Sequence, residues 1–251
     1  MGTDRQTNFF REYLTRTDSR TIYKMEHYLD VYHRLIGAWQ GRSDIRFLEI
    51  GIFEGGSIGL WNSFFAEGAH LVFADIDPEC RRFAEPGIEI EIGDQSDPVF
   101  LKSLGDSHGP FDLIIDDGGH MMHQQKTSFA NLWPYLSDGG LYVVEDTHSS
   151  YWPGFGGGFR NPASMMEAAK DLVDRMHSWY TDEDETFPLH PAASQVGSVQ
   201  FYDSMIVIEK QIKQPPVLLV SRNGTTTRSR RMLEIRGRGS IFNRPKDAPS
   251  E

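Results

Sequence analysis

Acidic and histidine side chains directly follow two apolar runs in the sequence. The run at 111–115 is followed by Asp-Asp-Gly-Gly-His at 116–120, and the run at 141–144 by Glu-Asp-Thr-His at 145–148. Each run has the length of a buried strand, so the acids would stand at strand ends. Like charges held close together cannot all ionise unless a cation compensates them. We therefore interpret these two segments as a reaction centre, to which the rest of the chain brings a cofactor and an acceptor.

Five expected strands alternate with segments that predict helices. The strands are expected at 45–50, 71–74, 88–92, 111–115 and 141–144, and the helices at 57–66, 78–83, 98–104 and 121–133. This alternation is typical of a parallel sheet covered by helices, and right-handed crossovers make it doubly wound. Runs at 196–202 and 205–209 are joined too tightly for a helix and predict an antiparallel hairpin. The predicted fold class is α/β: a Rossmann-like, doubly wound, seven-stranded sheet, six strands parallel and one antiparallel, with helices on both faces.

The chain divides into three expected parts. Residues 1–44 form an N-terminal helical cover, because apolar residues recur there at three- and four-residue steps. Residues 45–210 form the α/β domain, and residues 211–251 a weakly ordered basic extension. Within the domain, the loop at 147–162 combines glycines with aromatic residues. This composition favours a lid or acceptor-binding loop over a plain surface loop.

Composition and charge limit the class of protein. The 251 residues are 39% hydrophobic and 24% charged, which fits a globular chain without a membrane span. Residues 1–20 show no secretory signal, and the single Cys80 cannot form an intrachain disulfide, so we expect a cytoplasmic protein. The net charge is −11. Residues 211–251 carry nine basic and three acidic residues, hence +6, and the remaining residues carry −17. An acidic body argues against nucleic acid as the main partner.

The basic extension has two interpretations. In the first, its arginines contact phosphate or an acidic neighbouring subunit. In the second, they are simply exposed to solvent. The arginines are Arg228, Arg230, Arg231, Arg236 and Arg238. The first interpretation supports a homo-oligomer.

A glycine-rich turn follows the first expected strand and predicts a ligand-binding edge. Glu49, Gly51 and Ser57 border this turn, and Ser57 is expected to cap the helix that follows. The spacing departs from G-x-G-x-x-G, since a phenylalanine and a glutamate stand at 53 and 54. Asp75, closing the second strand, is placed to accept both hydroxyls of a ribose, and Asp94, closing the third, to meet an adenine edge. Either acid would alternatively cap its own loop. Together they predict an adenosine site without phosphates, which suits S-adenosylmethionine.

Four segments carry a resemblance to a known family. The segments at 49–51, 75–78, 116–120 and 145–152 resemble class I methyltransferases, and more narrowly the metal-dependent sugar O-methyltransferases of macrolide and enediyne antibiotic biosynthesis. The resemblance covers about 21–152 and the terminal hairpin, with Gly119 where the family has serine. It implies transfer of a methyl group from S-adenosylmethionine to a hydroxyl of a (deoxy)sugar or glycosylated substrate in natural-product biosynthesis. It also implies assembly into a homo-oligomer.

The resemblance assigns roles at the reaction centre, and the residue chemistry agrees. It implies Asp117, Glu145 and Asp146 as metal ligands and His120 as the catalytic base. Oxygen ligands at one sheet edge suit Mg²⁺ or another divalent cation, which can bind a hydroxyl and lower its pKa. His120 is close enough in sequence to Asp117 to remove that proton. Asp116 is expected to be a support beside the cofactor.

The loop after the fifth strand and the remaining histidines leave alternatives open. His148, Tyr151 and Trp152 are candidate substrate contacts, and His148 could instead serve as base or ligand. Asp117, His120 and His123 would make a two-histidine, one-carboxylate iron site. The histidines could also be purely structural.

Three other functions compete with sugar methylation. A catechol-type O-methyltransferase would act on a phenolic diol, and a non-catalytic protein would only bind S-adenosylmethionine. A nicotinamide dehydrogenase is disfavoured by the glycine spacing.

Overall fold

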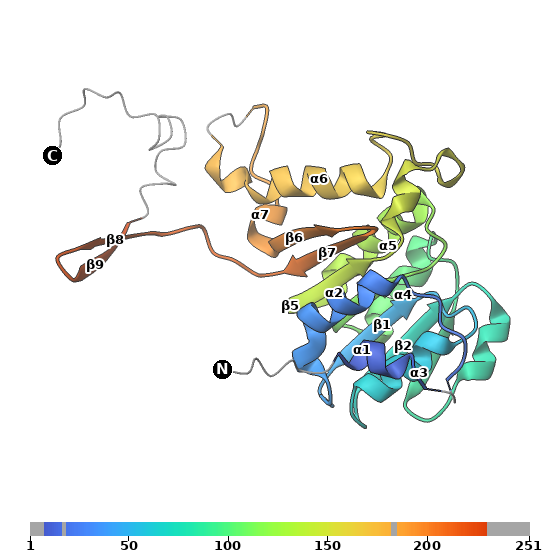
Figure 1. Ribbon diagram of the computed structural model, residues 1–251. Coiled ribbons are helices and arrows are strands. Elements are labelled where there is room, and N and C mark those ends of the chain that lie inside the picture. The colour runs from blue at the N-terminus through green and yellow to red at the C-terminus, as the bar shows by residue number, and fades with distance from the viewer. Residues whose placement is uncertain (1–7, 17–18, 182–184, 230–251) are drawn as a thin grey trace.

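The computed structural model describes residues 8–16, 19–181 and 185–229 (Figure 1). The expected basic positions at 230, 231, 236 and 238 lie outside the described residues. Within the described part of the chain, no helix is long and apolar enough to cross a membrane.

Seven strands form one sheet in the order β3-β2-β1-β4-β5-β7-β6. They are β1 (Arg46–Ile50), β2 (His70–Asp75), β3 (Ile88–Ile92), β4 (Phe111–Asp116), β5 (Leu136–Val144), β6 (Val196–Tyr202) and β7 (Met205–Lys210). β7 runs antiparallel to both of its neighbours, β5 and β6, so the other six strands of this sheet share one direction. This confirms the predicted six parallel strands and one antiparallel strand. The strand order reverses between β1 and β4, and ligands of such sheets bind where the carboxyl ends flank that reversal.

Helices cover both faces of the sheet, as the doubly wound pattern predicts (Figure 1). One face packs against α1 (Phe9–Tyr13), α2 (Glu26–Ile36) and α3 (Gly56–Phe64), and the other against α4 (Pro98–His108), α5 (Met122–Leu132) and α6 (Met165–Met176). The short elements are η1 (Gly37–Trp39), η2 (Pro78–Phe83), η3 (Trp133–Tyr135), η4 (Thr147–Tyr151), η5 (Pro153–Phe155), η6 (Ser178–Tyr180) and α7 (Ala192–Gln195).

An aromatic cluster attaches the N-terminal helices to the sheet. Phe10, Tyr32, Phe47, Trp61 and Phe64 are all at most 2% exposed, and the ring centroids of Phe10 and Phe64 lie 4.8 Å apart. Truncating one such buried aromatic costs about 3–5 kcal/mol. The cluster therefore fixes α2 firmly, and α2 carries tyrosines that reach the carboxyl edge of the sheet.

Two local predictions were wrong. Ser57 does not cap α3; the helix begins at Gly56 and is preceded by Gly55 in the left-handed region with φ 75°, a conformation that glycine adopts without strain. Weak order was expected from residue 211 on, but residues 211–229 contain regular structure. β8 (Leu218–Arg222) and β9 (Thr225–Ser229) form a separate hairpin that projects from the body (Figure 1). Its turn, Asn223 and Gly224, has positive φ at both positions, which suits an Asn-Gly hairpin turn.

Candidate active site

The register of three strands aligns the acids at one edge. Ile50 of β1 pairs with Asp116 of β4, and Asp116 pairs with Val144 of β5. The Asp117 N–H then donates to the Ile50 carbonyl (2.9 Å), and the Glu145 N–H donates to the Asp116 carbonyl (3.0 Å). The predicted meeting of both acidic segments at the carboxyl edge is therefore confirmed.

A lysine ammonium occupies the middle of the acid cluster. Lys24 Nζ lies 2.6 Å from Asp117 Oδ2, 2.7 Å from Glu145 Oε1 and 3.5 Å from Glu49 Oε1, and its side chain is 2% exposed. Burial opposes its charge, but the three carboxylates prevail and hold the pKa of Lys24 well above its usual value. Part of the compensating positive charge that the sequence requires thus comes from the chain itself.

Glu145 and Glu49 lie deep beneath the edge. The Tyr32 hydroxyl also donates to Glu145 Oε1, and the Glu145 side chain is 1% exposed. Burial, reinforced by the charge of Asp117, raises the pKa of Glu145 to about 8 against the opposing effect of Lys24. Burial likewise raises the pKa of the fully buried Glu49. Both carboxylates face Lys24, and Glu145 also lines a further cavity beside Tyr28 and Asp146.

Asp117, which also contacts Lys24, forms a second group with His120 and Asp146, and the ligand atoms of these three residues all lie within 4.8 Å of one another. His120 Nε2 is 3.6 Å from Asp146 Oδ2, and His120 Nδ1 is buried with no hydrogen-bond partner among the described residues. Two carboxylates and one imidazole fit a divalent cation. Glu145 lies outside this group, and so does the exposed His123 of the iron alternative. The predicted role of Glu145 as a ligand stays a prediction.

Backbone strain marks the same group. His120 (φ 55°) and Asp146 (φ 52°) both adopt the left-handed region without being glycine. Such residues cost on the order of 1–3 kcal/mol each and gather at functional sites. The Tyr28 hydroxyl stabilises the Asp146 conformation, because it donates to Asp146 Oδ1 (2.7 Å) and accepts from the Asp146 N–H (3.1 Å).

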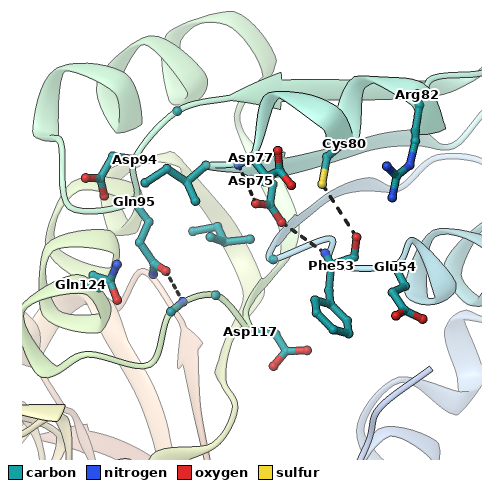
Figure 2. Close-up of a pocket in the computed structure, with 16 residues that line it drawn as sticks. Phe53, Glu54, Asp75, Asp77, Cys80, Arg82, Asp94, Gln95, Asp117 and Gln124 are labelled. Carbon is teal, nitrogen blue, oxygen red and sulfur yellow. Dashed lines mark hydrogen bonds between the residues drawn. The ribbon is translucent and has the colours of Figure 1, made fainter. Parts of the chain in front are cut away.

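Two cavities of about 440 Å³ each meet beside Asp117. The first, shown in Figure 2, is lined by the ends of β1, β2 and β3, including Asp75 and Asp94. The second is lined by residues 21–24, Ser57, His120 and Asp146. Gly51, Phe53, Glu54, Asp117 and Gly118 line both. A donor in one cavity and an acceptor in the other would therefore face each other across Asp117.

The sequence left two roles open for Asp75 and Asp94, a contact to the ligand and a cap of their own loops, and their positions are compatible with both. Asp75 Oδ2 accepts from the N–H groups of Ile52 (2.8 Å) and Phe53 (3.2 Å), so it braces the glycine turn (Figure 2). Asp94 Oδ1 accepts from the N–H and hydroxyl of Ser96. Both acids cap loops and also line the first cavity. Their predicted contacts to ribose and adenine remain predictions.

The other expected cofactor residues have different positions. Gly51 lines the first cavity with φ 102°, and a Cβ there would lie 2.1 Å from the Asp117 carbonyl oxygen. Of the two cavities, Ser57 lines the second and not the first, and Glu49 lines neither of them. Asp116 is fully buried and accepts from Gln95 Nε2 (3.0 Å), while Gln95 Oε1 accepts from the Gly119 N–H. Asp116 thus supports the glycine loop from below.

The expected substrate residues lie on η4 and just beyond it. His148 Nδ1 is 2.5 Å from Ser204 Oγ and its ring packs edge-on against Trp152. Tyr151 and Trp152 are about half exposed, and neither they nor His148 line the two cavities. The loop is held by its own hydrogen bonds, such as Gly158 N–H to the Ser150 carbonyl (2.8 Å). It is an ordered surface that presents aromatic rings.

Three residues that sequence reasoning missed complete the site: Lys24, Tyr28 and Tyr32. They recur at four-residue steps, which places them on one side of α2 and the turn before it. That spacing is the signal that could have found them, but packing against a core explained the tyrosines equally well.

Comparison with known proteins identifies the domain type. Residues 48–147 match a family described as a methyltransferase domain. The chain is 42% identical to the mycinamicin VI 2''-O-methyltransferase of Micromonospora griseorubida over 178 residues, covering 66% of this chain and 44% of that protein. It is 37% identical to the 8-demethyl-8-alpha-L-rhamnosyl tetracenomycin-C 2'-O-methyltransferase of Streptomyces olivaceus, covering 62% and 41%. The chain thus spans less than half the length of these relatives.

A solved structure agrees with the sequence relatives. The MycE methyltransferase from the mycinamycin pathway, in complex with Mg, SAH and mycinamycin VI, superposes with a TM-score of 0.70 at 28% identity, covering 83% of this chain and 54% of that one. The expected resemblance to class I methyltransferases, and to the sugar O-methyltransferases among them, is confirmed.

Proposed function

We propose that this chain transfers a methyl group from S-adenosylmethionine to a hydroxyl of a (deoxy)sugar, with Mg²⁺ or another divalent cation bound at the acid group. The observation that carries the proposal is the pair of cavities that meet at Asp117, beside the group of Asp117, His120 and Asp146. The named activities of the sugar-methylating relatives support it.

The first cavity suits the adenosine part of the donor. Asp75 and Asp94 both line it, and Gly51 lets the β1 loop approach the ligand closely. S-adenosylmethionine supplies an electrophilic methyl group on a sulfonium. The negative charge of Asp117 and Glu54 between the two cavities suits that cation.

The second cavity suits the acceptor. When bound by Asp117 and Asp146, with Glu145 as a further proposed ligand, the cation supplies a Lewis acid for the hydroxyl. His120 then takes the hydroxyl proton, since its imidazole lines this cavity beside Asp146. Tyr28 holds Asp146 in place during this step.

Exposed aromatic rings beside the second cavity are suited to a sugar. Tyr23 and Phe53 line the cavity, are 69% and 67% exposed, and contact each other edge-to-face at 5.5 Å. Aromatic faces pack well against the apolar face of a sugar ring. We propose these two rings as substrate contacts, with Tyr151 and Trp152 as a further surface for a larger glycosylated acceptor.

The experiment is an acceptor panel with S-adenosylmethionine and Mg²⁺, read by mass spectrometry. The panel contains a glycosylated macrolide, a nucleotide-activated deoxysugar and a catechol. Methylation of a sugar hydroxyl is expected, and its position follows from fragmentation. Methylation of the catechol alone would replace this proposal with the phenolic one, and donor binding without turnover on any acceptor would favour a binding protein.

The proposal also covers the assembly and the cellular location of the protein. We propose a homo-oligomer in the cytoplasm with a small-molecule acceptor and no nucleic-acid or membrane partner. Light scattering on the purified chain tests the assembly, and a monomeric mass at working concentration would contradict it.

A further inference from the structure

A second cluster of metal-binding side chains lies at the opposite edge of the sheet. His70 is the first residue of β2, Glu89 is the second residue of β3, and His108 is the last residue of α4. These positions lie at the amino ends of the parallel strands, whereas the candidate active site lies at the carboxyl ends. The proposed methyl transfer therefore gives this cluster no role.

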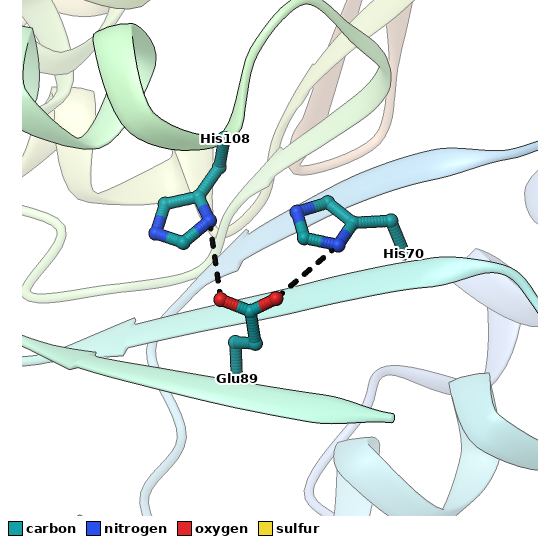
Figure 3. Close-up of side chains that lie close together, drawn as sticks. All are labelled: His70, Glu89 and His108. Atoms are coloured by element: carbon teal, nitrogen blue, oxygen red, sulfur yellow. Dashed lines mark ion pairs between the residues drawn. The ribbon is translucent and has the colours of Figure 1, made fainter. Parts of the chain in front are cut away.

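The two imidazoles converge on one carboxylate (Figure 3). His70 Nδ1 is 3.3 Å from Glu89 Oε1, and His108 Nδ1 is 3.3 Å from Glu89 Oε2. Charge-assisted hydrogen bonds are shorter, about 2.7–2.9 Å. Ligand atoms around a tetrahedral ion, each roughly 2.0–2.1 Å from it, stand about 3.3 Å apart. The two imidazoles contact different oxygens of Glu89, and one ligand atom from each of the three residues lies within 4.8 Å of the other two, which leaves a shared ion within reach of all three.

The surroundings of His108 match those of a metal ligand. His108 Nε2 lies 2.9 Å from Glu91 Oε1, so a carboxylate holds the ring nitrogen that points away from Glu89, as is usual for a ligating histidine. His70 Nε2 is buried and has no hydrogen-bond partner among the described residues.

Charge around the cluster is compatible with a cation. The nearby guanidinium of Arg46 donates to the His108 carbonyl oxygen, and Glu89 and Glu91 place two carboxylates beside it. The Glu89 side chain is 49% exposed, so water can reach a fourth coordination position.

We propose that His70, Glu89 and His108 form a binding site for Zn²⁺, with Glu91 orienting His108. Two imidazoles and one carboxylate are a ligand set that zinc prefers over magnesium. The ion would join the edge strand β3 to β2 and to the end of α4, and it would therefore stabilise the amino edge of the sheet. This proposal is independent of the proposed methyl transfer.

The test uses Co²⁺ as a spectroscopic substitute for Zn²⁺ on the full chain after chelator treatment, with Mg²⁺ in excess. Tetrahedral Co²⁺ absorbs strongly in the visible range, whereas an octahedral ion at an oxygen-rich site absorbs weakly. We expect the strong bands in the wild-type chain and in Asp146→Asn, and their loss in His70→Gln and Glu89→Gln. Zn²⁺ is expected to displace Co²⁺ and to raise the melting temperature of the wild-type chain.

Matched variants separate the site from general effects. His177→Gln removes an exposed imidazole elsewhere and is expected to retain the bands. Glu91→Gln is expected to weaken binding about 10–100-fold without abolishing it. Circular dichroism checks that each variant is folded, and His70→Gln serves as the main variant because its ring is partly exposed. Bands that persist in folded His70→Gln, or that disappear in Asp146→Asn, would overturn the proposal.

Discussion

At the scale of single residues, Lys24 changes how the acid cluster is understood. The sequence predicted that Asp117, Glu145 and Asp146 meet with His120 at one sheet edge, because parallel strands alternate with helices and the acids stand at strand ends. It could not predict the ammonium between Asp117 and Glu145, since that contact depends on how α2 packs across the sheet. The same packing brings Tyr28 to Asp146.

Replacing Lys24 with methionine should destabilise the chain in the absence of divalent cations. The change leaves buried carboxylates without their compensating charge, and breaking such a group costs about 3–5 kcal/mol. Thermal unfolding in chelator measures the loss. Added Mg²⁺ should raise the melting temperature of Lys24→Met more than that of the wild-type chain.

The control is Lys170→Met, which removes an exposed lysine paired with Glu167 and should change stability little. Equal melting temperatures for Lys24→Met and Lys170→Met in chelator would contradict the role of Lys24.

Asp116 should make the free energy of unfolding fall as the pH rises. Burial raises its folded-state pKa from 3.8 to about 6, so the protonated form is favoured in the folded chain. The stability this contributes is complete below pH 3.8 and is lost as the pH rises through about 6. The difference of roughly two pKa units corresponds to about 3 kcal/mol.

Asp116→Asn removes this titration but can keep the contact to Gln95. Urea unfolding across this pH range should show the stability of the wild-type chain falling relative to that of Asp116→Asn. Parallel pH profiles would show that Asp116 does not titrate in this range.

At the scale of elements, the sequence predicts which helices and strands exist and in what order better than it predicts their first and last residues. Every strand of the main sheet was expected, because each is an apolar run bounded by glycine, proline or acids. β5 begins at Leu136 and not at 141. Its first half was not predicted, because Gly139 and Gly140 are typical of a turn and not of a strand. The Ser57 cap was wrong because the turn enters α3 through Gly55. The hairpin β8–β9 was missed although Asn223-Gly224 signals it.

Gly51→Ala should disrupt the contact between the β1 turn and the β4 end. The new Cβ would lie 2.1 Å from the Asp117 carbonyl oxygen at a φ of 102°. Displacement of Asp117 should abolish measurable binding of S-adenosylmethionine in calorimetry. Gly87→Ala is a matched control, since φ is 85° there and nothing lies within 4 Å of the added Cβ. If Gly51→Ala and Gly87→Ala bind the donor equally well, the close approach at Gly51 is not required.

At the scale of the whole molecule, the two edges of one sheet carry different groups of potential metal ligands. Carboxylates dominate the carboxyl edge around Asp117, and imidazoles dominate the amino edge around His70 and His108. The sequence predicted the first edge because its acids directly follow strands. It did not predict the second, since His70, Glu89 and His108 become neighbours only through the crossing of β2, β3 and α4.

The most direct test of the central claim is the rate of methyl transfer to a sugar hydroxyl, measured by mass spectrometry with and without Mg²⁺. Chelation is expected to abolish turnover, and added Mg²⁺ is expected to restore it. His120→Asn, which tolerates the left-handed backbone, should lower kcat by about 10²–10⁴-fold while donor binding is retained. A chelated chain that keeps its full rate, or a His120→Asn variant with the wild-type kcat, would contradict the proposed chemistry of this site.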